Sequence, residues 1–128
     1  QGQVDMVITG ADRVAINGDA ANKIGTYLTA LAAKDNDVPI DIAGPINTFD
    51  FACENGLKDI EIEQRDQDEV HYIQGLNAAG DVEQMRITPE NTQAANYGFD
   101  ITPARLITGL ITEKGIIAPN QKAIGKLQ

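Results

Sequence analysis

The fold is decided by residues 4–43, which read VDMVITGADRVAINGDAANKIGTYLTALAAKDNDVPIDIA. Val4–Thr9 is a short apolar run that ends at a glycine, a pattern that predicts a buried parallel strand. Apolar residues then recur at helical spacing from Asn22 to Lys34, and Val38–Ala43 is a second apolar run. Because strand–helix–strand units normally close with a right-handed crossover, this stretch predicts an α/β fold with a mainly parallel sheet.

The expected helix has one apolar face and a clear end. Ile24, Leu28, Leu31 and Ala32 recur at the spacing of a single helical face, which we expect to pack on the sheet. The polar run Asp35–Asp37 is expected to end the helix before the second strand begins.

Composition and charge limit the classes of function. The length of 128 residues fits one domain. The net charge of −9 argues against a nucleic-acid partner, because neutralising phosphates requires clustered lysine and arginine. Cys53 is the only cysteine, which excludes an intrachain disulfide and a cysteine zinc framework and favours a cytoplasmic setting. No apolar run is long enough for a membrane helix, so no membrane partner is expected.

The middle of the chain predicts shorter elements. A short helix is expected within Thr48–Glu54, and the alternation in Ile60–Glu63 predicts an exposed edge strand. Asp66–Met85 is polar and contains two glycines, so we expect an irregular segment or a hairpin there.

Near the C-terminus the sequence predicts one more helix. Thr102 can accept a capping hydrogen bond, Pro103 suits the first helical position, and Lys114–Gly115 supplies a cation and a glycine at the end. Asp100 is expected to belong to the cap of this helix. The tail Ala118–Gln128 is expected to be loosely held.

The candidate site is a glycine-rich segment between the first strand and the helix. Asp12 follows the end of the strand, where α/β sheets bind ligands, and half-burial there would raise the pKa of its carboxyl toward neutrality for proton transfer. Asn22 and Lys23 lie at the expected helix start, where free N–H groups, the amide and the ammonium could hold a small phosphate ester. Two plainer roles stay open, since Asp12 could cap a turn or pair with Arg13, and Lys23 could extend into solvent.

Other polar residues are weaker candidates. Cys53 is expected to be a small buried apolar side chain and not a nucleophile. His71 is the only histidine, so no metal site is expected from it. Asp66, Asp68 and Glu69 have the pattern of a solvated acidic surface.

Gly10–Thr26 resembles the signature G-A-D-R-[IV]-x-x-N-G-D-x-A-N-K-I-G-T of the S-methyl-5-thioribose-1-phosphate isomerases, which are aldose–ketose isomerases of the initiation-factor 2B-like group. The similarity continues, in order along the chain, at Val38–Ile40, Pro45–Asp50, Ile60–Arg65, Phe99–Ala104 and Ile111–Gly115.

The resemblance implies that residues 1–128 are the Rossmann-like, three-layer C-terminal domain of a two-domain enzyme, a homodimer at full length. Such an enzyme converts an aldose 1-phosphate into a ketose 1-phosphate in methionine salvage, with no cofactor and no metal. Its acid–base aspartate maps to Asp12, and its substrate-binding asparagine and lysine map to Asn22 and Lys23. The small phosphorylated pentose would be 5-methylthioribose 1-phosphate or 5-deoxyribose 1-phosphate, because Gly44, Gln64 and residues 74–98 depart from the commoner pattern.

Two similar groups of proteins remain as alternatives. Ribose 1,5-bisphosphate isomerases carry a similar aspartate and Asn-Lys pair, but Asp19 and Phe99–Pro103 fit them less well. Regulatory subunits of a translation-initiation exchange factor act by protein contacts, and they tend to lack the acid at Asp12. The family's catalytic cysteine and its arginine-containing phosphate-binding stretches belong to the preceding region, so residues 1–128 alone are expected to be inactive.

Overall fold

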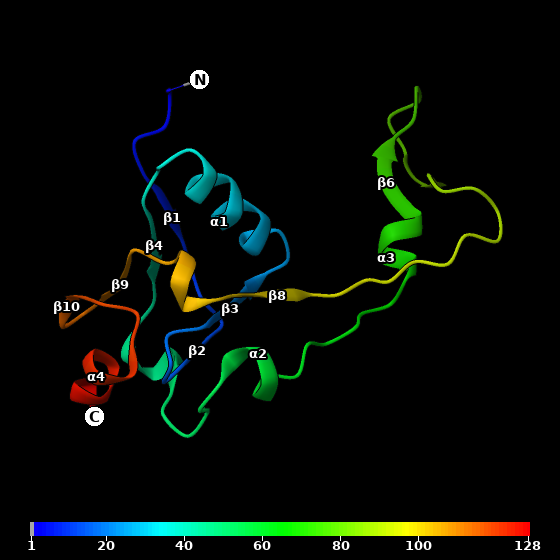
Figure 1. The fold of residues 1–128 in the computed structure, drawn as a ribbon. Helices are drawn as coiled ribbons and strands as arrows, with labels where there is room; N and C mark the ends of the chain where they lie inside the picture. The colour runs from blue at the N-terminus through cyan, green and yellow to red at the C-terminus, as the bar shows by residue number, and fades with distance from the viewer. Residues whose placement is uncertain (1) are drawn as a thin grey trace. The chain divides into compact units, whose positions relative to one another are not determined.

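The computed structural model describes residues 2–128, which form two compact units. The larger unit contains the chain up to Ile62 together with Phe99–Gln128, and the smaller unit is Glu63–Gly98 (Figure 1). The α/β class is confirmed, and the strands of the described residues are divided among several small sheets. Both sheets of the larger unit combine parallel and antiparallel pairs.

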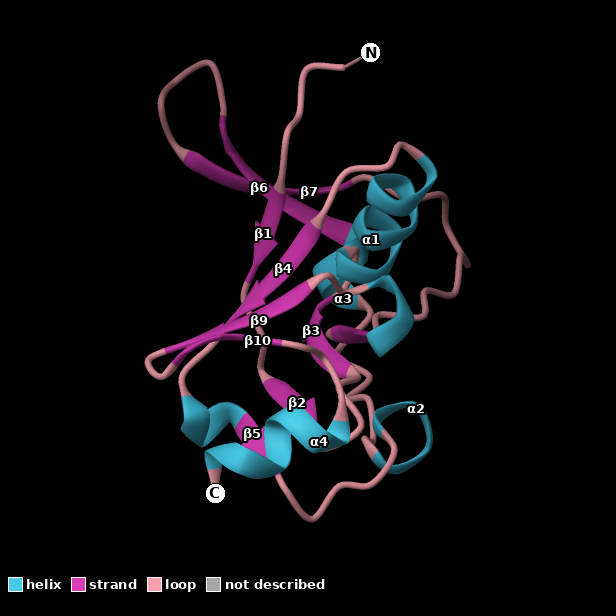
Figure 2. Ribbon diagram, turned by 60° about the vertical axis from the view of Figure 1, so that its left-hand side comes forward, coloured by secondary structure: helices cyan, strands magenta, loops and turns pink. Residues whose placement is uncertain are grey.

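The first sheet of the larger unit has the strand order β1-β4-β9-β10. β1 (Val7–Thr9), β4 (Ile40–Ala43) and β9 (Gly109–Thr112) are parallel, and β10 (Gly115–Ile117) returns antiparallel to β9 (Figure 2). The predicted parallel pair is therefore confirmed. The prediction that the first strand is buried is wrong, because Ile8 at the centre of this edge strand is 57% exposed.

α1 (Thr26–Asp35) begins later than the sequence pattern predicts and ends where it predicts. Thr26, Ala30 and Ala33 are its buried residues, and the two alanines pack with Ile40 of β4. The predicted apolar face is wrong, since it is exposed; its residues are Ile24, Leu28, Leu31 and Ala32. Both stripes repeat at helical spacing, and the stripe with small side chains is the one that allows the helix to approach the sheet closely.

The second sheet of the larger unit has the strand order β5-β2-β3-β8. It consists of β2 (Arg13–Ala15), β3 (Ala20–Lys23), β5 (Phe49–Asp50) and β8 (Phe99–Thr102). β2 and β5 are parallel, and the other pairs are antiparallel. The segment between β1 and α1 is thus mostly a β2–β3 hairpin and not the loop that was expected.

The segment after β4 is also not helical in the way predicted. A 3₁₀ helix at Ile46–Thr48 leads directly into β5, so the short helix expected within Thr48–Glu54 is wrong. The next helix, α2 (Gly56–Asp59), follows Asn55, whose side chain accepts a hydrogen bond from the backbone N–H of Lys58.

The predicted last helix is wrong as well. Thr102 ends β8, a 3₁₀ helix occupies Ala104–Leu106, and the chain then forms the β9–β10 hairpin. The apolar pairs Leu106–Ile107 and Leu110–Ile111 are two residues apart, a spacing that fits either a helix or a short strand with turns. The second pair lies in β9, which pairs with β4 and is therefore a strand.

The C-terminal tail is part of the core and not loosely held. It forms α4 (Gln121–Ile124) and a 3₁₀ helix at Gly125–Leu127. Ile124 and Leu127 are buried in a cluster that joins both sheets; its other buried members are Val14, Ala20, Ile42, Phe49, Ile107 and Leu110. The tail therefore covers the hairpin on which Asp12 and Asn22 lie.

The smaller unit contains α3 (Asp68–His71) and a hairpin of β6 (Tyr72–Leu76) and β7 (Val82–Arg86). The expected hairpin in this region is confirmed. The edge strand predicted at Ile60–Glu63 is wrong, because the chain there forms no strand. Among residues 2–128, no helix is long and apolar enough to cross a membrane.

Candidate functional site

Asp12 lies between β1 and β2, where the hairpin of the second sheet begins. Its backbone N–H donates to the carbonyl of Ala21 at 2.8 Å, so the hairpin fixes its position. It is exposed and not half-buried as expected. Asp12 borders an open pocket of about 150 Å³, which is also lined by Arg13, Ala21, Ile60, Glu61, Ile62 and Phe99. Arg13 forms its ion pair with Asp50 at 3.7 Å, so Asp12 is not its ion-pair partner.

Asn22 and Lys23 are the last two residues of β3, so the expectation that they begin a helix is wrong. They pair with Asp100 and Phe99 of β8, and these ladder hydrogen bonds hold the segment extended. Consecutive residues of a strand point to opposite faces of the sheet. The Asn22 amide therefore contacts Thr26 at the start of α1, whereas the Lys23 ammonium lies on the other face, against Phe99.

Strand pairing sets Asn22 beside Asp100, whereas Asp12 lies just outside the regular ladder. Asn22 is paired with Asp100 across the β3–β8 pair. Because directly opposed residues of antiparallel strands share a face, Asn22 and Asp100 lie on one face of the second sheet. Asp12 is in a bend before β2, and its N–H bonds to Ala21, the residue with which Arg13 is paired. Asp12 and Arg13 therefore both lie opposite Ala21.

The carboxylate of Asp100 caps α1. Its Oδ2 accepts a hydrogen bond from the backbone N–H of Gly25 at 2.7 Å, and its Oδ1 accepts one from Tyr27 at 3.0 Å. The expectation that Asp100 caps a helix near the C-terminus is wrong, because β8 runs beside the start of α1. The start of α1 already holds an anionic group, so it is not the phosphate site that the sequence predicted.

Lys23 lies against an aromatic ring at the edge of the same sheet. Its Nζ is 4.7 Å from the centroid of the Phe99 ring, directly across the β3–β8 pair. Such a contact stabilises an exposed cation by about 0.5–1 kcal/mol and leaves its charge accessible. Phe99 also lines the pocket beside Asp12, so the ammonium lies close to that pocket.

Asp19 is a buried structural carboxylate whose role the sequence does not predict. It is 4% exposed, and its carboxylate accepts hydrogen bonds from Ala104 N at 2.9 Å, Asn17 Nδ2 at 2.7 Å and Leu57 N at 3.3 Å. These donors come from the hairpin turn, from α2 and from the segment after β8. The Asn17–Gly18 pair signals the turn, but nothing local indicates the two distant donors.

The weaker candidates have structural partners. Cys53 is buried, and this burial, with the nearby charges of Asp50 and Asp59, raises the pKa of its thiol above the ordinary value. His71 is buried, with Nδ1 at 2.8 Å from Thr88 Oγ1. Within residues 2–128, no group of three or more His, Cys, Asp or Glu side chains could hold a metal ion.

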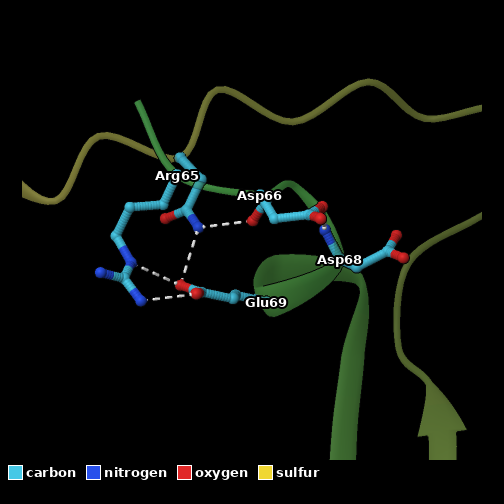
Figure 3. Close-up of polar contacts among 5 residues, drawn as sticks. Arg65, Asp66, Asp68 and Glu69 are labelled. Atoms are coloured by element: carbon cyan, nitrogen blue, oxygen red, sulfur yellow. Dashed lines mark hydrogen bonds and ion pairs between the residues drawn. The ribbon is translucent and has the colours of Figure 1, made fainter. Parts of the chain in front are cut away.

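The expected acidic surface in the smaller unit is exposed and partly paired (Figure 3). Glu69 accepts two hydrogen bonds from the guanidinium of Arg65, at 2.7 and 2.9 Å, and this raises the pKa of Arg65. Asp66 Oδ1 accepts a hydrogen bond from the backbone N–H of Asp68 at 2.9 Å. These contacts order one turn of chain and assemble no reactive group.

Comparison with known proteins gives one family and a consistent set of relatives. The model of the Initiation factor 2 subunit family matches residues 1–119. The chain is 58% identical over 120 residues to a methylthioribose-1-phosphate isomerase of Sulfurimonas denitrificans, covering 94% of this chain and 33% of that protein. It is 55% identical over 126 residues to a protein of the same name from Brucella anthropi, covering 98% and 35%. The chain thus spans about a third of the length of these relatives.

Solved structures agree with these matches. The 5-methylthioribose 1-phosphate isomerase of Pyrococcus horikoshii OT3 is 40% identical with a TM-score of 0.84, covering 99% of this chain and 33% of that one. Subunit delta of the translation initiation factor eIF-2B from A. fulgidus is 36% identical with a TM-score of 0.81, covering 98% and 34%. Both kinds of protein foreseen by the resemblance therefore have this fold.

Proposed function

Because the chain belongs to the Initiation factor 2 subunit family, we propose that it is part of an aldose–ketose isomerase acting on a phosphorylated pentose. The substrate is 5-methylthioribose 1-phosphate or 5-deoxyribose 1-phosphate, and the product is the corresponding ribulose 1-phosphate of methionine salvage. The names of the relatives at 58% and 55% identity support this reaction. The observation that carries the proposal is the exposed Asp12 beside a pocket that Phe99 also lines, with Lys23 held against the Phe99 ring.

The reaction explains why an aspartate is needed. With the oxygen at C1 esterified, the sugar ring cannot open by losing an anomeric proton, so the ring oxygen must receive one. Asp12, as general acid, donates that proton while the bond from C1 to the ring oxygen breaks. The hydrogen on C2 then moves to C1, as a hydride or through an enol, and the 2-hydroxyl returns a proton to Asp12 as the ketone forms. A positioned acid–base group of this kind contributes about 10²- to 10⁴-fold in rate.

Asn22 and Lys23 bind the substrate from the two faces of the edge of β3. Lys23, which is held against Phe99, offsets the phosphate charge. Asn22, on the other face of β3, hydrogen-bonds the sugar. Since Asp100 already occupies the start of α1, further phosphate contacts come from outside residues 2–128.

The same proposal extends to the architecture. β1, β4 and β9, with α1 packed on them, correspond to the parallel strands and one helix layer of a Rossmann-like C-terminal domain. The full-length protein is a cytoplasmic homodimer that uses no cofactor. Residues 1–128 alone have no isomerase activity, because the catalytic cysteine and the arginine-containing phosphate site of the family lie elsewhere.

A regulatory role in translation initiation is the second candidate, and the similarity to the A. fulgidus subunit delta favours it. A regulatory subunit acts through protein contacts and has no use for an acid at the rim of the sheet. The presence of Asp12 together with Asn22 and Lys23 favours the enzyme.

The test is ketose formation by the full-length protein with 5-methylthioribose 1-phosphate, 5-deoxyribose 1-phosphate and ribose 1,5-bisphosphate. We expect turnover of one of the first two, and a loss of about 10²- to 10⁴-fold in kcat in Asp12→Asn. Asp5→Asn, at another exposed aspartate, is the matched control and keeps full activity. Full activity in Asp12→Asn would remove Asp12 from the mechanism, and no turnover of any of the three sugars would favour the regulatory role.

A further inference from the structure

The Thr26 hydroxyl connects the end of β3 to the first turn of α1. Thr26 is 7% exposed, and its Oγ1 lies 2.7 Å from the carbonyl oxygen of Lys23 and 3.0 Å from Nδ2 of Asn22. One side chain thus contacts both residues that are proposed to bind the substrate.

The number of protons in this contact fixes the orientation of the Asn22 amide. A carbonyl oxygen can only accept a hydrogen bond, so the single hydroxyl proton of Thr26 is donated to Lys23. The Thr26 oxygen can then only accept from Asn22, which must turn its NH₂ group toward it. Flipping the amide would bring two acceptors together with no proton between them.

The orientation turns the Asn22 carbonyl oxygen away from Thr26 and toward Gly10. A Cβ atom at Gly10 would be 4.0 Å from Asn22 Oδ1, and no other atom would come as close to that Cβ. The absence of a side chain at Gly10 therefore leaves room beside this oxygen. An amide oxygen accepts hydrogen bonds from hydroxyl groups and cannot donate to a phosphate.

We propose that Thr26 is a positioning residue that presents Asn22 to the substrate as a hydrogen-bond acceptor for a sugar hydroxyl, leaving the phosphate to other groups. The inference rests on the proposed isomerase function and deepens it. It divides the two neighbouring binding residues by chemistry, with Asn22 for the hydroxyl and Lys23 for the phosphate.

The experiment compares two ligands in the full-length protein. KM is measured for the sugar 1-phosphate substrate, and inorganic phosphate, which carries no sugar hydroxyl, is measured as a competitive inhibitor. Thr26→Val keeps the shape of the side chain and removes the hydroxyl, and Thr26→Ser restores it. Thr29→Val is the matched control, because the Thr29 hydroxyl also donates to a carbonyl of this turn, Gly25 O at 2.9 Å, without contacting Asn22.

In Thr26→Val we expect KM for the sugar phosphate to rise about 3- to 10-fold, the range for one lost hydrogen bond, with a smaller change in kcat. The inhibition constant of phosphate should stay as in the wild type. Thr26→Ser should restore KM, and Thr29→Val should leave both constants unchanged. If Thr26→Val does not fold, Thr26→Ala removes the same hydroxyl while favouring the helix.

Each other outcome overturns the inference in its own way. Equal weakening of sugar phosphate and phosphate would mean that Asn22 serves the phosphate. An unchanged KM in Thr26→Val, with an active wild type, would mean that Thr26 positions nothing the substrate uses. A wild-type protein without isomerase activity would overturn the proposed function first, and this inference with it.

Discussion

The carboxylate of Asp19 accepts a hydrogen bond from the backbone N–H of Ala104 at 2.9 Å, across 85 residues of sequence. Asp19 lies in the turn of the β2–β3 hairpin, and Ala104 begins the 3₁₀ helix after β8. The same carboxylate accepts from Asn17 and Leu57. One buried side chain therefore joins the hairpin to segments at both edges of the second sheet.

We expect Asp19→Asn to lower the free energy of unfolding by about 3 kcal/mol, because the new NH₂ group faces buried donors and leaves them unsatisfied. Urea unfolding of the full-length protein measures the change. Asp37→Asn is the control, since Asp37 is exposed at a φ of 55°, which asparagine tolerates, and a change within about 0.5 kcal/mol is expected. Equal stability of the two variants would show that the Asp19 contacts do not hold the sheet together.

Gly18 can be tested against a second glycine with a positive φ. Gly18 has a φ of 93°, and a Cβ there would lie 2.4 Å from the carbonyl oxygen of Pro119. Gly115 has a φ of 113° with nothing within 4 Å of the same position. We expect Gly115→Ala to cost about 1–2 kcal/mol for the backbone alone. Gly18→Ala should cost about 1–3 kcal/mol more, because the tail must move away from the turn. Similar unfolding midpoints in urea would contradict the close packing of the tail on this hairpin.

Local patterns predicted the elements whose partners are near in sequence. The β1–β4 pair and the end of α1 followed from apolar runs and from the acidic stretch at Asp35. The prediction of a last helix was wrong because the spacing of the apolar residues after Thr102 fits both a helix and a short strand with turns. Only pairing with β4 selects the strand. Which stripe of α1 is buried depends on the sheet beneath it, and amphipathic spacing alone carries no such information.

In the candidate site, too, local sequence predicts the residues but not their geometry. Asp12, Asn22 and Lys23 stand out by residue type, and their family signature is contiguous in sequence. Their geometry depends on strand pairing, which turned an expected loop and helix start into a hairpin. Asp100 could not be assigned to α1 from sequence because its two donors are 75 and 73 residues away.

Removing a carboxylate is predicted to have different effects on stability at the two ends of α1. Asp100→Ala removes the acceptor for Gly25 N and Tyr27 N, and we expect a loss of about 1–2 kcal/mol, as for other helix caps. Asp35→Asn removes a negative charge from the C-terminal end of α1, where it opposes the helix dipole, and should be neutral or stabilising by up to about 1 kcal/mol. Thermal unfolding of both variants is the measurement. If both variants lose stability, the interaction of these charges with the helix dipole does not determine the stability of α1.

Cys53 is predicted to be an inert thiol. Burial, together with Asp50 and Asp59, raises its pKa in the folded protein, so little thiolate forms near neutral pH. We expect iodoacetamide to modify Cys53 several-fold more slowly in the folded protein than in urea. Because the folded pKa is the higher one, ionisation favours the unfolded chain as pH rises above the unfolded pKa.

The wild type should therefore lose more stability between about pH 7 and about pH 10 than Cys53→Ala, in which this titration is absent. Cys53→Ala should also keep the isomerase activity proposed for the full-length protein. Loss of that activity in a folded Cys53→Ala variant, or rapid alkylation at neutral pH, would instead identify Cys53 as a reactive group. Its neighbours Asp50 and Asp59 argue against that outcome, because negative charge disfavours the thiolate.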